Sequence, residues 1–419
     1  YFPVENPKAT KIIQKEHVKS ALRADKGSDA VLRSWKAIPF TKKGDGYAGY
    51  VTCVIVKYGL GCALKEVTYV VKVNPCGFGF YGDRLALIFE KEVKFYTKLL
   101  LDLNSELESV GQDPLKFPKC YYASLEKDKE IFFLEDLRPL GYKMADMNQK
   151  GLDICHTKLV IKESGRLHAA SKLLTEKISN EEFKLKYDFL LEEGFVSSQF
   201  SENLTFITDF LDTSGGYDNV RKWVTYLKSN AKELLEDQRG SSPPFDVVCH
   251  GDLITNNLLF RYDDDNKPID VIFIDLQLNR FASAALDLEK LLFLSVDTAT
   301  RNSNLDEILS IYYKSFLEVL SYANNSIEIP YTKDEFKEEF KKKNPFGMLW
   351  GMFGMPSIIS NTDDLLDFQS VPEDKWEQVM AEFGSNLSEK LKTNPLLKPR
   401  LLDLLDEINQ CERIGSYCK

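Results

Sequence analysis

The chain has 419 residues, a formal net charge of -10 and an isoelectric point near 5.2. Its composition, 43% hydrophobic and 28% charged, excludes a largely disordered chain. Its length predicts two lobes with a cleft between them. The acidic balance argues against sequence-independent binding of nucleic acid, which needs clustered Lys and Arg residues.

The eight cysteines include no Cys-x-x-Cys pair, and with only four His residues a zinc site is not expected. We interpret them as free thiols of a reducing compartment. The N-terminus lacks an apolar signal core, and the longest apolar stretch, 346–359, is shorter than the roughly 20 residues that span a bilayer. We therefore expect a cytoplasmic protein without a nucleic-acid, membrane or obligate protein partner.

The first 137 residues show the patterns of a small sheet-rich lobe. Strands are expected at 34–40, 50–56, 67–73 and 130–137, and amphipathic helices at 1–30 and 87–101. Three strands in direct succession imply an antiparallel sheet. Arg138, Pro139 and Gly141 then interrupt the pattern, so residues 138–150 are expected to form a hinge.

From residue 151 to 419 the pattern is mainly helical, as expected for a larger second lobe. Two apolar segments, 257–261 and 269–274, interrupt the helices and are joined by the turn-rich sequence YDDDNKP. They predict a β-hairpin. The fold class that follows is α+β, with a small antiparallel-sheet lobe and a larger, mainly helical lobe.

A short polar segment lies just before this hairpin, in VVCHGDLITNNLLF at 247–260. His250, Asp252 and Asn257 fit the spacing H-x-D-x-x-x-x-N of a kinase catalytic loop. In such a loop the Asp orients the attacking hydroxyl as the catalytic base, and the Asn binds a magnesium ion. Asp275, at the end of the second hairpin strand, is the candidate for the second magnesium ligand. A loop whose polar side chains only cap backbone groups is the alternative.

Gly44, Gly46 and Gly49 lie in GDGYAG, which matches G-x-G-x-x-G. A strand follows, whereas the dinucleotide-binding motif opens a helix, so the segment fits a strand-loop-strand flap over ATP phosphates. An ordinary hairpin turn is the alternative.

Lys72 lies in the apolar strand YVVKVN, where a buried ammonium needs a partner. Glu92 in the next helix is the expected partner, with Glu90 as the less favoured choice. Such a pair holds the α- and β-phosphates of ATP in kinases. A Lys that reaches solvent from a strand edge would be the non-functional alternative.

Four further features have weaker functional signals. Backbone groups of Glu135 and Leu137, where the chain passes between the lobes, could bind the adenine edge, although an acidic turn explains them nearly as well. His168 is expected to be a core histidine, and Asp287 a helix N-cap. The Met-rich segment 346–359 fits a buried helix better than the wall of an acceptor pocket.

These residues together resemble the ecdysteroid kinase-like family of insects, within the aminoglycoside and choline kinase group. The resemblance rests on VVCHGDLITNNLLF with VIFIDLQ, preceded by YVVKVNP, FEKEVKFY, FFLEDL and LHAAS, and it extends over about residues 30–400. It implies a two-lobed protein-kinase-like fold that uses ATP and Mg²⁺ to phosphorylate a hydroxyl of a small molecule, with ecdysteroids as the founding substrates.

The resemblance also implies the roles of individual residues. Asp252 would be the catalytic base, Asn257 and Asp275 the magnesium ligands, and Lys72 with Glu92 the phosphate-anchoring pair. Ile254 and Leu276 stand where the family usually has Trp and Phe, so the walls of the acceptor pocket are expected to differ.

Two other functions stay open. A kinase for choline or an aminoglycoside would need acidic groups or an aromatic cage around its cationic acceptor. A catalytically silent binding protein would typically have lost the loop Asp, the metal-binding Asp or the strand Lys, and all three are present. A protein kinase is disfavoured because D-F-G and A-P-E segments are absent from the sequence.

Overall fold

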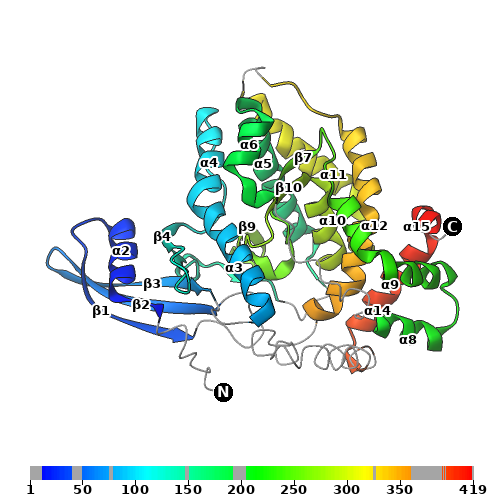
Figure 1. Cartoon of the computed structure of the whole chain (residues 1–419), viewed down its shortest axis with the longest axis horizontal. Helices are drawn as coiled ribbons and strands as arrows, with labels where there is room; N and C mark the ends of the chain where they lie inside the picture. The colour runs from blue at the N-terminus through cyan, green and yellow to red at the C-terminus, as the bar shows by residue number, and fades with distance from the viewer. Residues whose placement is uncertain are drawn as a thin grey trace.

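The computed structural model describes residues 12–39, 50–74, 79–146, 151–191, 204–323, 327–359, 389, 391 and 393–417. Figure 1 shows a sheet-containing part formed by the N-terminal residues beside a larger, mainly helical part. This arrangement confirms the expected α+β fold class. No helix within the described ranges combines the length and the apolar character that crossing a membrane requires.

The N-terminal part is built on a five-stranded sheet in the order β1-β2-β3-β5-β4, and every neighbouring pair is antiparallel. Helix α2 packs against β1 and β4, where its buried residues Val18, Ala21 and Leu22 join the sheet core. The bounds of these elements are α2 (Lys15–Lys26), β1 (Val31–Pro39), β2 (Tyr50–Leu60), β3 (Ala63–Val73), β4 (Cys120–Ser124) and β5 (Ile131–Glu135).

One long helical segment connects β3 to β4. It contains helix α3 (Gly79–Lys94), a single π-helical turn (Phe95–Leu99) and helix α4 (Leu100–Ser109). The sequence analysis expected only the middle of this segment, at 87–101. Phe89, Phe95 and Leu99 are fully buried and belong to a core cluster that extends into the helical part, so the segment packs the two parts together.

The helical part encloses two small antiparallel sheets, in the orders β10-β7 and β6-β8-β9. The hairpin expected from the sequence is β8 paired with β9, so that prediction is confirmed. The strands are β6 (Lys143–Met144), β7 (Asp246–Cys249), β8 (Leu258–Tyr262), β9 (Pro268–Phe273) and β10 (Arg280–Ser283).

The helices pack around these sheets. Helix α5 packs against α11, and α10 packs against α12. Each helix of the first pair begins at an Asp that caps a backbone N–H, Asp153 for α5 and Asp297 for α11. The helices are α5 (Ile154–Lys177), α6 (Asn180–Lys186), α8 (Thr205–Ser214), α9 (Asp218–Arg239), α10 (Ala285–Leu294), α11 (Thr298–Ser321), α12 (Lys333–Ile359), α14 (Leu397–Gln410) and α15 (Glu412–Tyr417).

All ten residues of α10 are buried, including the three charged residues Asp287, Glu289 and Lys290. A buried charge needs a partner because transfer from water to the protein interior is costly. Asp287 and Lys290 each have a partner in the loop between β7 and β8, and α10 therefore supports that loop from within the core.

Candidate active site

The H-x-D-x-x-x-x-N segment forms the loop between β7 and β8, and Asp287 of α10 anchors its start. The Asp287 carboxylate accepts hydrogen bonds from the backbone N–H groups of His250 (2.7 Å) and Gly251 (2.8 Å). Burial alone would raise the pKa of Asp287, but hydrogen bonding from His168 and the nearby His250 hold this pKa below its usual value. The expectation that Asp287 caps a helix is wrong, since the N-cap of α10 is Ala284.

Gly251 occupies a position that only glycine fits. Its φ is +79°, in the left-handed region, and a Cβ atom there would lie 1.9 Å from the carbonyl oxygen of Leu278. The glycine thus allows the catalytic loop to pass directly against the segment that follows β9.

His250 joins the catalytic loop to the end of β9. Its Nδ1 accepts from the backbone N–H of Asp252 (3.2 Å), and its Nε2 lies 3.0 Å from the carbonyl oxygen of Ile274. The two contacts require a neutral ring that carries its proton on Nε2. Complete burial lowers the pKa of His250, which favours the same neutral form. The histidine therefore links Asp252 to the residue that precedes Asp275.

The hairpin brings Asn257 and Asp275 to the same place, as the sequence predicts. The backbone N–H of Ile274, next to Asp275, donates to the carbonyl oxygen of Asn257 at 3.0 Å. The Asn257 amide nitrogen donates to the backbone oxygen (2.8 Å) and to Oδ2 (2.9 Å) of Asp252. These bonds orient the Asn257 amide and leave its oxygen as an acceptor beside Asp252.

Lys72 connects the five-stranded sheet to this hairpin. Its Nζ lies 2.8 and 3.0 Å from the two carboxylate oxygens of Glu92 and 3.2 Å from Oδ1 of Asp275. The Lys72–Glu92 ion pair that the sequence predicts is therefore present, whereas Glu90 pairs with Lys94. One ammonium thus holds carboxylates from both parts of the fold.

The charges of this pair respond to burial and to one another. Burial alone would lower the pKa of Lys72, but the charges of Asp275 and Glu92 raise it above its ordinary value. Burial raises the pKa of Glu92 to about 7, although Lys72 opposes the shift, and the charge of Asp275 adds to it. Gln277 also hydrogen-bonds Glu92 and favours its ionised form.

Asp275 has a strained backbone conformation, with a φ of +66°. Asp and Asn tolerate this left-handed region better than other residues with a side chain, and such outliers gather at functional sites. The conformation lets the chain turn at the end of β9 while the carboxylate remains beside Lys72 and 28% exposed.

The oxygen atoms of Asn257 and Asp275 suit a magnesium ion, which binds few protein ligands, chiefly carboxylates, together with phosphate oxygens and water. A different group of metal-type ligands, His168, Cys249 and Asp287, is completely buried in the core. Tyr312 and Asp287 bond the two nitrogens of His168, and backbone carbonyls accept from Cys249. This cluster is satisfied by protein groups, and His168 is a core histidine as expected.

The structure does not test several of the predicted contacts with ATP. Gly44, Gly46 and Gly49 lie outside the described residues. The backbone N–H of Glu135 donates to Lys119, and the carbonyl oxygen of Leu137 accepts from Leu140 and Tyr142. Recognition of adenine by Glu135 and Leu137 therefore stays a prediction.

Lys290 and Gln277 were not singled out by sequence reasoning, although both touch the site. Lys290 Nζ lies 2.6 Å from Oδ1 of Asp252. The signal for Lys290 is a lysine in LEKLLF, within a mainly apolar helix, where a buried ammonium requires a carboxylate. Gln277 could have been identified as a site residue because it lies only two residues after Asp275 in the sequence.

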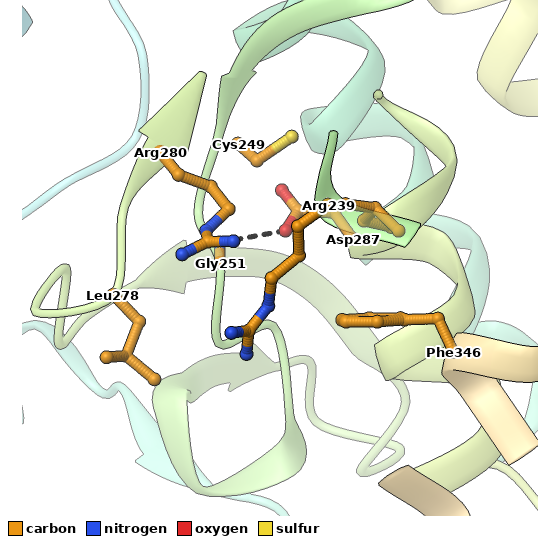
Figure 2. Close-up of a pocket in the computed structure, with 8 residues that line it drawn as sticks. Arg239, Cys249, Gly251, Leu278, Arg280, Asp287 and Phe346 are labelled. Carbon is orange, nitrogen blue, oxygen red and sulfur yellow. Dashed lines mark hydrogen bonds between the residues drawn. The ribbon is translucent and has the colours of Figure 1, made fainter. Parts of the chain in front are cut away.

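A small pocket lies beside the catalytic loop (Figure 2). Figure 2 shows the side chains of Arg239 and Arg280 approaching one another beside Gly251, with the ring of Phe346 nearby. The Met-rich segment is part of α12, and Met348, Met352 and Met355 are buried. This burial agrees with the expected core helix, while Phe346, the first residue of the segment, lines the small pocket.

Comparisons with known proteins give the following matches. The choline kinase LicA from Streptococcus pneumoniae is 14% identical, with a TM-score of 0.36, over 89% of this chain and 99% of its own. A choline/ethanolamine kinase family protein from Mesorhizobium loti is 9% identical, with a TM-score of 0.36, over 87% of this chain and 92% of its own. No curated protein matches the chain in a sequence search.

The model of the ecdysteroid kinase-like family matches residues 43–325, which is more than half of the chain. The matched region includes the predicted flap, Lys72, Glu92, the catalytic loop and Asp275. The resemblance seen in these motifs is thereby confirmed. The chain belongs to the ecdysteroid kinase-like family.

Proposed function

We propose that this kinase transfers the γ-phosphoryl group of Mg-ATP to a hydroxyl of an ecdysteroid or a similar apolar alcohol. The observation that carries the proposal is the convergence of Lys72, Glu92, Asp252, Asn257 and Asp275 from the sheet, α3, the catalytic loop and the hairpin. An ammonium, two oxygen ligands and a carboxylate base are the parts that phosphoryl transfer needs.

In the proposed reaction the Asp252 carboxylate orients the acceptor hydroxyl and takes its proton. The hydroxyl oxygen forms a bond to the γ-phosphorus while the bond between this phosphorus and the oxygen of ADP breaks. Asn257 holds the Asp252 carboxylate through one oxygen, so the base is oriented before the substrate arrives. Positioning and charge stabilisation carry most of the rate enhancement in such reactions.

Lys72 is positioned to bind the α- and β-phosphates of ATP, with Glu92 keeping its ammonium in place. Asn257 and Asp275 would hold magnesium, which neutralises the charge that develops on the phosphate oxygens. Gly44, Gly46 and Gly49 are proposed to cover the phosphates, and Glu135 and Leu137 to bind adenine. A cytoplasmic location is part of the proposal, because the six cysteines in the described ranges are free thiols.

The test is mass spectrometry of the products formed from Mg-ATP and a panel of ecdysteroids, other sterols, plant alcohols, choline and an aminoglycoside. The expected result is one added phosphoryl group on an ecdysteroid. The Asp252→Asn variant should lower this rate by about 10²- to 10⁴-fold, since that is the usual contribution of a general base.

The remaining outcomes separate the alternatives. Phosphorylation of choline or the aminoglycoside alone would overturn the apolar acceptor and favour the second type of kinase. Failure of the protein to bind Mg-ATP by calorimetry would overturn kinase activity and favour a silent binding protein.

A further inference from the structure

Lys290 is a buried cation in direct contact with the proposed catalytic base. Its side chain is 3% exposed, and its Nζ lies 2.6 Å from Oδ1 of Asp252. The same Nζ donates to the carbonyl oxygen of Gly251 at 3.1 Å and lies 4.1 Å from the ring centre of Trp350. Helix α10 therefore contributes a charged group to the loop, and α12 contributes the aromatic ring that packs on it.

These contacts fix Asp252 from two sides. Asn257 donates to Oδ2 at 2.9 Å, and Lys290 contacts Oδ1. A carboxylate held at both oxygens loses the freedom to rotate, which is the property that a general base needs to meet the acceptor hydroxyl in one orientation. Asn257 alone would hold one oxygen only.

The same contact changes the charge that an acceptor meets. Asp252 is about a quarter exposed, and without a counter-ion its carboxylate would attract a cation. Lys290 lies 2.6 Å from this carboxylate and neutralises its charge. A quaternary ammonium acceptor would therefore gain little attraction from Asp252, whereas an uncharged alcohol loses nothing by this pairing.

We propose that Lys290 is a positioning residue that orients Asp252 and makes the kinase select uncharged alcohols over cationic ones. This inference rests on the proposed function, because it assigns Lys290 to the same phosphoryl-transfer site. It adds a residue from α10 to the site and predicts the charge class of the acceptor.

The experiment compares wild type, Lys290→Met, Lys290→Arg and the control Lys343→Met. Lys343 is matched to Lys290 because its side chain is also 3% exposed and its Nζ also donates to a backbone carbonyl, that of Gln238. Thermal unfolding first checks that each variant is folded. The rates of phosphoryl transfer from Mg-ATP are then measured with water, with choline and with 3,3-dimethylbutan-1-ol, the uncharged analogue of choline.

Lys290→Met should lower kcat for water and for the uncharged alcohol by about 10²-fold, with the KM for Mg-ATP unchanged, because the base is no longer held. It should also raise the ratio of kcat/KM for choline to that for the uncharged analogue by about tenfold or more. Lys290→Arg, which keeps the charge, should retain the wild-type ratio. Lys343→Met should leave kcat, KM and the ratio unchanged.

The possible failures are distinguishable. If Lys290→Met is folded and matches Lys343→Met in kcat and in the choline ratio, the role of Lys290 is overturned while the kinase function stands. If wild type does not bind Mg-ATP, the proposed function is overturned and the inference with it. If it binds Mg-ATP but transfers phosphate to neither alcohol nor to water, the selection of uncharged alcohols by Lys290 is overturned, while the proposed function is decided by the ecdysteroid panel.

Discussion

Two buried lysines, one from each part of the fold, contact the carboxylates of the site and differ in how their charge is stabilised. Lys72 of the sheet meets both Glu92 and Asp275, and the pKa of its ammonium is raised despite burial. Lys290 of α10 pairs with one carboxylate among the described residues, that of Asp252, and burial lowers its pKa although Asp252 opposes the shift. The number of partner carboxylates therefore decides whether the pKa of a buried lysine is raised or lowered.

This difference suits the two proposed roles. A lysine that binds phosphates must stay charged, and two carboxylates keep Lys72 in that state. A lysine that only orients a carboxylate needs one partner and a fixed place, which Lys290 obtains from Gly251 and Trp350. The comparison can be tested by changing the number of carboxylates or by removing either ammonium.

The largest effect is expected from Asp275→Asn, which leaves Lys72 with one carboxylate, as Lys290 has. Asn tolerates the left-handed backbone of this position, so the fold should persist. Because the proposed ligand for magnesium is lost, phosphoryl transfer should fall by about a thousandfold or more. The measurement is kcat and KM for Mg-ATP, and circular dichroism checks the fold; undiminished turnover would remove Asp275 from the mechanism.

The next largest effect is expected on the free energy of unfolding of the protein without bound nucleotide. Lys72→Met leaves Glu92 and Asp275 without their cation and should lower the free energy of unfolding by about 3–5 kcal/mol. Lys290→Met should cost less, about 1–3 kcal/mol, because Asp252 is partly exposed and keeps the bond from Asn257.

Urea unfolding of both variants measures this difference. Adding Glu92→Gln to Lys72→Met should recover part of the loss, because one buried charge is then removed. Equal losses for the two lysine variants would show that the number of partner carboxylates does not set the stability of the site.

The smallest effect is a pH dependence of stability from Glu92. Its pKa is about 7 in the folded protein and 4.5 in the unfolded reference, so the folded state binds more protons between these values. The contribution of Glu92 to the free energy of unfolding is therefore fully present below pH 4.5 and is lost as the pH rises to about 7. The free energy of unfolding of wild type minus that of Glu92→Gln should decrease over this range, by an amount on the order of 2 kcal/mol.

Urea unfolding of apoprotein at several pH values provides the measurement. Glu92→Gln serves as the reference because it keeps the shape of the side chain but cannot titrate. A difference between the two proteins that stays constant with pH would contradict the raised pKa of Glu92.

Much of the fold was predictable because its signals are local. Strand periodicity placed β2 and β3 close to their observed bounds, and the turn between 257–261 and 269–274 indicated the β8–β9 hairpin. The short strands β7 and β10 were not predicted, since their four residues lie among apolar segments that carry no clear period. The full length of α3 and α4 was missed for a related reason, because the helix continues beyond its amphipathic middle.

The sequence by itself determined the groups that share one local element: Asp252 and Asn257 in one loop, Asp275 at the end of the hairpin, and Lys72 with a carboxylate in the next helix. Only the tertiary structure decided the contacts across the fold. Asp287 was expected to cap its own helix, yet it binds the catalytic loop, and Lys290 reaches Gly251 across 39 residues of sequence. Spacing specifies neighbours along a chain, whereas the position of the buried helix α10 is set by the packing of the whole core around it.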